Sequence, residues 1–188
     1  FDYTSSNEFS VAFWFRSANN AGALFQYMFS HGDVNAVQAL NIYLIESDHV
    51  RDPDVMRTYL WATGDIDDPF ALDVQIDGEI ADHQWHHYAL TVDAAASRVY
   101  IDGVERRISE QGGEAFAPAT DIFVGGRFDL NADRFFWGGM DELRIYNRAL
   151  SASEVGGLYD PPAFADLVVT DITWSPAAPG HGEAVTFS

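Results

Sequence analysis

Short runs of strand-forming residues, each ended by turn residues, recur along most of this 188-residue chain. In the run 9–16, Val11, Phe13 and Phe15 share one face and the residues between them share the other, which is the period of a strand. Comparable runs occupy residues 23–31, 40–46, 56–63, 72–76, 86–92, 98–101, 122–125 and 140–146. Many short strands with little helix predict an all-β, antiparallel β-sandwich with jelly-roll connections.

The last of these runs leads into the one helix that the sequence predicts. Within the run, Asp141 and Ile145 are expected on the same face of a strand because even spacing returns a side chain to the same side. Ser151 then occupies an N-cap position, with Glu154 three residues later, which is the spacing of a capping box. We therefore expect one short helix that extends through Leu158, at the C-terminal end of the sandwich.

The formal net charge is -19, and all ten basic residues are arginine. Such a surface repels phosphate backbones and anionic membranes, so nucleic acid is not an expected partner. No apolar run reaches the ~18 residues that a membrane-spanning helix needs, so membrane insertion is not expected either. The acidic residues favour a well-solvated surface, and some of them could in addition bind divalent cations.

The composition changes after residue 160. Pro161 and Pro162 break regular structure, so residues 161–165 are expected to form a linker after a first domain at 1–160. The remaining segment, 166–188, holds only two strand-like runs. Two strands cannot bury a sandwich core, and the segment is therefore expected to be the truncated start of a second domain.

Five segments of the first domain resemble, in their order and spacing, the bacterial laminin-G-like family of concanavalin A-like proteins. They are Phe9–Phe15, Trp85–Tyr88, Val99–Gly103, Ile122–Gly126 and Gly139–Leu150. The resemblance implies a concanavalin A-like sandwich, mostly non-catalytic, that binds sugars or mediates adhesion and is joined to further domains. Residues 166–188 resemble the opening of an immunoglobulin-like CARDB domain, which is common in bacterial and archaeal surface proteins.

The same resemblance implies a structural Ca²⁺. Asp141 matches the position at which related jelly-roll proteins hold this ion, and Gly32, Asp33 and Asp2 are its candidate companions. Loop carbonyls and one or two carboxylates can supply the six to eight oxygens that Ca²⁺ takes. The alternative is that Asp141 accepts backbone N–H bonds in a turn.

No catalytic residues are predicted. The Glu-x-Asp-x-x-Glu arrangement of the related hydrolases is missing, and Glu46 with Asp48, at a strand end, comes closest to a carboxylate pair. His86 and His87 invite a zinc interpretation. However, neighbouring residues of a strand point to opposite faces, so these two histidines cannot share one ion.

Sugar binding needs aromatic rings for the C–H faces of a pyranose and planar polar groups for its hydroxyls. The candidates lie on two neighbouring strand-like runs and beside the acidic loop 129–133: Tyr43, Tyr59, Trp61, Asn41, Arg57, Arg127 and Trp137. The rings of the two runs alternate with aliphatic residues and are expected on the outer side of the concave sheet. The alternative is that these rings fill the core.

The sequence therefore predicts a non-catalytic module that binds a polysaccharide or other glycan, or adheres to a surface protein, with Ca²⁺ as a stabilising ion. It is expected to belong to a larger secreted or cell-surface protein. Two alternatives stay open: a structural or protein-adhesion spacer without a sugar site, and a cryptic polysaccharide-degrading enzyme.

Overall fold

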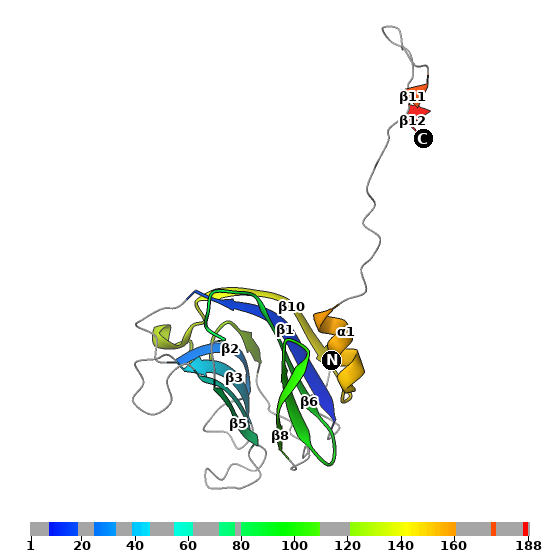
Figure 1. Cartoon of the computed structure of the whole chain (residues 1–188). Coiled ribbons are helices and arrows are strands. Elements are labelled where there is room, and N and C mark those ends of the chain that lie inside the picture. Colours follow the sequence, from blue (N-terminus) through cyan, green and yellow to red (C-terminus); the bar gives the residue numbers. More distant parts are fainter. Residues whose placement is uncertain are drawn as a thin grey trace.

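Two five-stranded antiparallel sheets face each other across a shared core (Figure 1). The computed structural model describes residues 8–18, 25–32, 39–45, 55–61, 72–77, 80–109, 121–160, 174–175 and 186–187. The first sheet has the order β10-β1-β6-β7-β8, with β1 at Phe9–Ser17, β6 at His86–Val92, β7 at Ser97–Ile101, β8 at Val104–Ser109 and β10 at Gly138–Tyr146. The second has the order β5-β4-β3-β2-β9, with β2 at Phe25–Gly32, β3 at Ala39–Ile45, β4 at Val55–Trp61, β5 at Leu72–Asp77 and β9 at Ile122–Val124. The predicted antiparallel β-sandwich is confirmed.

The core lies between the sheets because each strand directs alternate residues inward. Val11, Phe13 and Phe15 of β1 are fully buried, as their alternation in the sequence predicted. They share one cluster with apolar residues of the second sheet: Met28, Phe29, Leu40, Ile42, Leu44, Met56 and Leu60. Across this core, the hydroxyls of Thr58 in β4 and Tyr88 in β6 lie 2.6 Å apart and share a hydrogen bond, so neither buried hydroxyl is left without a partner.

One helix, α1 at Ala152–Tyr159, covers part of the outer face of the first sheet (Figure 1). Its N-terminus is closed by the predicted capping box, which is confirmed. The Ser151 hydroxyl accepts the Glu154 N–H at 3.3 Å, and the Glu154 carboxylate accepts the Ser151 N–H at 2.9 Å. Beneath the helix, a second small apolar cluster contains Ala12, Ala89, Tyr100, Leu150 and Val155.

Strand β10 contains a bulge that changes the predicted facing of Asp141. The pairing of β10 with β1 shifts register between Ala12 and Trp14, and Asp141 pairs with Trp14. At the bulge, Glu142 has a φ of 49°, in the left-handed region that residues other than glycine seldom occupy. Asp141 therefore lies on the outer face, whereas Ile145 packs against the core. The prediction that these two residues share a face is wrong, because the extra residue reverses the alternation.

Strand β8 was not predicted from the sequence. Its Glu105, Arg106 and Arg107 hide any apolar alternation, and five of its six residues are exposed. The strand lies at the edge of the first sheet, beside β7. Charged side chains on an edge strand hinder pairing with another molecule, which accounts for a strand without an apolar pattern.

A separate two-stranded pair lies near the C-terminus. Strand β11, Trp174–Ser175, pairs antiparallel with β12, Thr186–Phe187. The CARDB identity of segment 166–188 stays a prediction, and the predicted linker lies outside the described residues. No helix in the described part of the chain is long and apolar enough to cross a membrane.

Replacing Ser10 with alanine tests the connection between β1 and the start of α1. The buried Ser10 hydroxyl donates to the Arg148 carbonyl at 2.9 Å and accepts the Leu150 N–H at 2.9 Å. Because Ser10→Ala removes the partner of both main-chain groups, we expect the free energy of unfolding to fall by about 1–3 kcal/mol, measured by urea denaturation. Ser153→Ala, at an exposed position of α1, is the control and should change it by less than ~0.5 kcal/mol. An unchanged urea midpoint for Ser10→Ala would contradict this account.

Candidate functional site

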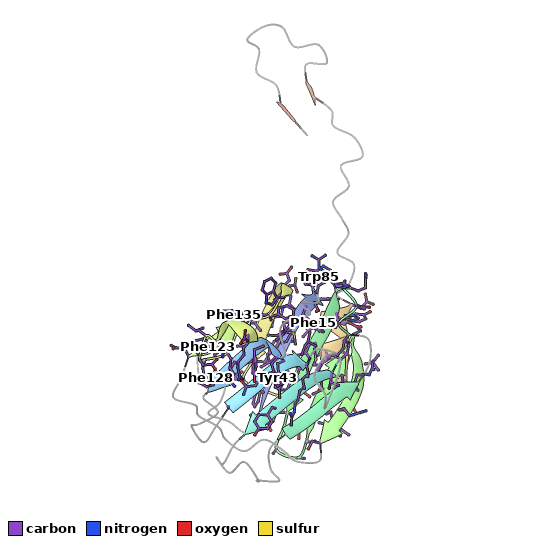
Figure 2. All side chains as sticks on the ribbon, turned by 90° about the vertical axis from the view of Figure 1, so that its left-hand side faces the viewer. Phe15, Tyr43, Trp85, Phe123, Phe128 and Phe135 are labelled. Carbon is purple, nitrogen blue, oxygen red and sulfur yellow. The ribbon has the colours of Figure 1, made fainter. Side chains whose placement is uncertain are left out.

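The candidate site is the outer face of the second sheet, where three strands bring aromatic and arginine side chains together. Tyr59 of β4 pairs with Asn41 of β3, and Arg57 pairs with Tyr43, which in turn pairs with Tyr27 of β2. Residues that pair directly point to the same face of a sheet. Figure 2 looks onto this sheet and shows Tyr43 on its strands. We define the aromatic–arginine surface by the following residues: Phe25, Tyr27, Tyr43, Arg57, Tyr59 and Arg127.

The rings of this surface form a packed layer. Tyr27 and Tyr43 are stacked with centroids 4.7 Å apart, and Phe25 meets Tyr43 edge-on at 6.0 Å. Tyr43 is 7% exposed, so it supports its neighbours and is not the exposed platform that the sequence predicted. Tyr59 is half-buried and packs against the same cluster. The sequence analysis did not include Phe25 and Tyr27 among the candidates. Their spacing of two residues predicts that both rings lie on the same face of a strand, so this signal was present in the sequence.

Arginine side chains lie over these rings. The guanidinium carbon of Arg57 is 5.9 Å from the ring centre of Tyr59. That of Arg127 is 5.5 Å from the ring centre of Tyr27 and 4.9 Å from that of Phe128. Contacts at these distances are attractive because the face of an aromatic ring is electronegative. The arginines thus present hydrogen-bond donors directly beside aromatic surface.

An acidic residue fixes Arg127 in this position. The Asp129 carboxylate accepts a hydrogen bond from Nε of Arg127 at 3.2 Å and makes a second, closer contact with Nη2. These bonds lower the pKa of Asp129. Nε of Arg134 lies 3.9 Å from the same carboxylate, and its guanidinium carbon lies 5.9 Å from the Phe25 ring centre. The sequence gave no reason to include this arginine. Asp129 therefore stays ionised and orients cationic groups along one border of the surface.

The remaining predicted sugar-binding residues lie apart from the exposed part of this surface. Asn41 is 2% exposed, and its Oδ1 accepts the Ser30 hydroxyl at 2.7 Å, so its amide is part of the packed sheet. Trp137 is 53% exposed, and its backbone N–H donates to Oε1 of Gln26 at 2.9 Å. No ring contact among the described residues joins its indole to the aromatic–arginine surface. The side chain of Trp61 lies outside the described part of the structure.

The predicted calcium ligands do not come together in the described residues. Asp141 is on β10 and Gly32 ends β2 in the other sheet, while Asp2 and Asp33 lie outside the described residues. Oδ1 of Asp141 accepts the Glu142 N–H at 2.7 Å, which is the turn-capping alternative. Across the described ranges, no group of three or more His, Cys, Asp or Glu side chains could hold a metal ion. Calcium therefore stays a prediction.

A family match covers all the strands of the two five-stranded sheets. The family described as the concanavalin A-like lectin/glucanases superfamily matches residues 2–156. The chain belongs to this superfamily. The prediction of a laminin-G-like domain is thereby confirmed. No curated protein sequence matches the chain at a significant level.

Solved structures of this superfamily's fold include three informative neighbours. Domain 4 of AbnA, a GH43 extracellular arabinanase from Geobacillus stearothermophilus in complex with arabinotriose, is 27% identical with a TM-score of 0.57, over 82% of this chain and 68% of that one. The CBM40 of a Ruminococcus gnavus IT-sialidase, bound to α2,3 sialyllactose, is 14% identical with a TM-score of 0.63, over 83% and 84%. A heptameric SAP-like pentraxin from Limulus polyphemus is 16% identical with a TM-score of 0.59, over 81% and 70%. The last two share the fold.

In this concanavalin A-like domain, two adjacent histidines point to opposite faces of β6, as the sequence predicted. The His86 ring contacts Phe15 on the inner side, with Nδ1 2.8 Å from Asp102 and Nε2 3.0 Å from Asp82. Burial alone would lower the pKa of His86, but the hydrogen bonds and charges of both carboxylates outweigh it and raise that pKa. Both carboxylates therefore stabilise the protonated form of His86.

His87 has the opposite electrostatic environment. Its ring is 2% exposed, lies 5.3 Å from the Trp14 ring, and leaves Nδ1 without a hydrogen-bond partner in the described structure. Burial lowers the pKa of His87 to about 4; the charge of Asp102 opposes this shift and that of Arg144 adds to it. The neutral imidazole is consequently the native form.

We expect the two histidines to titrate separately in NMR spectra, His86 above pH 6.5 and His87 near pH 4. Because unfolded His87 binds a proton near pH 6.5 and folded His87 does not, its contribution to stability falls by about 2 kcal/mol between pH 6.5 and 5. His86 acts with the opposite sign, and its contribution is lost as pH rises above 6.5. Urea denaturation at several pH values measures both, and His87→Gln should flatten the acidic slope. Coincident titrations near pH 6.5 would contradict the two environments.

Proposed function

We propose that this domain is a non-catalytic carbohydrate-binding module whose glycan lies on the aromatic–arginine surface. The observation that carries the proposal is that Arg57 lies over half-buried Tyr59 on this sheet face, while Arg127 lies over Tyr27 of the same face and also contacts half-buried Phe128 beside it. Two neighbours in fold, the arabinanase domain in complex with arabinotriose and the CBM40 bound to sialyllactose, support it.

The chemistry of the surface suits a sugar. The C–H faces of a pyranose or furanose pack against aromatic rings, while its hydroxyls accept hydrogen bonds from planar donors. Arg57 and Arg127 supply such donors beside the rings of Tyr59 and Phe128. Tyr43, buried and stacked on its neighbour, holds the layer rigid, which lowers the ordering cost of binding.

Asp129, which the structure describes beside this surface, does not have the electrostatics of a glycosidase acid. Hydrolysis needs one carboxylic acid with a raised pKa and a second, ionised carboxylate facing it. Asp129, the carboxylate beside these rings, has a lowered pKa because Arg127 hydrogen-bonds to it. Such a group is a poor proton donor. Glu46 and Asp48 lie outside the described residues.

The cellular setting forms part of the proposal. A glycan-binding module acts where polysaccharides or glycoconjugates are found, so we place the domain in a secreted or cell-surface protein with further domains. A module that holds a larger protein on a glycan needs no catalytic group of its own.

Replacing Tyr59 with alanine should weaken glycan binding. The variant removes the most accessible tyrosine of the surface, and loss of a ring against a sugar is expected to cost about tenfold in affinity. Affinity electrophoresis through gels containing arabinan or polygalacturonate measures the retardation of wild type and variant. Trp85→Ala, which removes a 43% exposed ring from the other sheet, is the matched control and should migrate like the wild type. Equal retardation of Tyr59→Ala and wild type would show that the glycan does not bind at Tyr59. No retardation of the wild type in any gel would favour the alternative of a structural or protein-adhesion spacer without a sugar site.

We propose in addition that Ca²⁺ stabilises the native domain. An ion that binds only the folded form adds about 2.7 kcal/mol when its free concentration is a hundred times Kd. We therefore expect a higher melting temperature in Ca²⁺ than in EGTA. Asp141→Asn keeps an oxygen for the Glu142 N–H but removes the charge, so a smaller calcium effect in this variant would assign Asp141 to the ion. Identical melting temperatures in Ca²⁺ and EGTA would contradict the proposal that Ca²⁺ stabilises the domain.

A further inference from the structure

A second candidate site lies on the first sheet, on the side of the sandwich away from the aromatic–arginine surface. A hollow of about 270 Å³ is lined by Trp14, Trp85, Asp141 and Glu142. Trp14 comes from the outer face of β1, Trp85 precedes β6, and the two carboxylates come from the bulge of β10. Figure 2 shows Trp85 at one end of the sandwich, away from Tyr43. We call this hollow the tryptophan pocket.

The walls of the tryptophan pocket are fixed by their neighbours. Trp14 stacks on Tyr159 of α1, with ring centroids 5.7 Å apart, and also meets the buried His87 ring. Trp85 lies across β10 at Gly139, where an added Cβ would stand 2.9 Å from the indole. A side chain at Gly139 would therefore displace Trp85. These contacts hold both indoles in place, as a preformed site requires.

One of the two carboxylates of the pocket, Asp141, has no ion-pair partner among the described residues. Glu142 pairs with Arg144 at 2.6 Å. Asp141 accepts one backbone N–H, and no arginine within the described residues forms an ion pair with it. The guanidinium carbon of Arg16 lies 5.3 Å from the Trp85 ring centre, which shows that this ring already attracts a cation.

We infer that the tryptophan pocket binds a small organic ammonium group. Indole faces attract an ammonium and the apolar groups around it, and Asp141 supplies the counter-charge. A phosphate or sulfate would meet two carboxylates. A bare Ca²⁺ inside the hollow would face indoles where it needs oxygen ligands, so a calcium ion bound by Asp141 would have to lie outside the hollow. The inference is independent of the proposed glycan site, because no residue is shared.

Two classes of ligand carry an organic ammonium group, and an experiment can distinguish them. An amino sugar such as glucosamine combines a primary ammonium with a sugar ring, whereas a methylated amine presents only an apolar cation. Glucosamine and tetramethylammonium are therefore the two probes, and N-acetylglucosamine, which has no charge, is the neutral comparison. Chemical shifts of the indole N–H groups, followed by NMR in EGTA, report binding at Trp14 and Trp85.

We expect saturable shifts with at least one of the two cations, weaker at high salt, and none with N-acetylglucosamine. Trp85→Ala and Asp141→Asn should each weaken binding about tenfold, through loss of the ring or of the charge. Arg16→Gln should tighten it about threefold, because it removes a cation that competes for the Trp85 ring. Tightening is a result that damage to the fold would not produce.

Tyr59→Ala serves as the matched control, because it removes a ring from the aromatic–arginine surface and should leave ammonium binding unchanged. Equal binding of N-acetylglucosamine and glucosamine would overturn the inference in favour of a neutral sugar site. Loss of binding in Tyr59→Ala, weaker binding in Arg16→Gln, or no saturable shift with either cation would also overturn it. Failure of the glycan gels with intact ammonium binding would remove the proposed function alone.

Discussion

Strand β1 determines the position of most other features, because its one alternation serves both faces of the first sheet. Inward, Val11, Phe13 and Phe15 fill the centre of the core. Outward, Ala12 is small enough for α1 to pack over it, and Trp14 stands next, where the helix ends. A shift of one residue would exchange the two sets and expose three core residues, so the register of β1 with β6 and β10 is strongly specified.

The parts of the fold that local sequence controls could be predicted, and those that depend on neighbouring strands could not. The strands follow from period-two alternation, and α1 follows from the Ser151 capping box, both of which are local patterns. Burial of Tyr43 depends on Tyr27, which belongs to another strand. The bulge at Glu142 carries no glycine or asparagine that would signal positive φ, so alternation assigned Asp141 to the wrong face.

No single segment of the sequence predicted the tryptophan pocket. Trp14 and Trp85 lie far apart in the sequence, and they approach each other only because β1 pairs with β6. Gly139 opposite them looks like an ordinary glycine of a strand until the indole above it is seen. By contrast, Tyr43 of β3 and Tyr59 of β4 lie on one face, as their alternation predicts, since directly paired strands share their alternation.

Aromatic rings form both candidate sites, and the charges around the rings distinguish them. On the aromatic–arginine surface the protein places its own arginines over the rings, so their positive charge is already present and a ligand contributes hydrogen-bond acceptors. In the tryptophan pocket Arg16 lies over Trp85, while Asp141 has no ion-pair partner among the described residues and the whole chain has a net charge of -19. No described arginine lies over the second indole, Trp14, so at this ring and at Asp141 the ligand has to supply the cation. Each ring face can attract a cation, and whether the chain or the ligand provides that cation decides what the site selects.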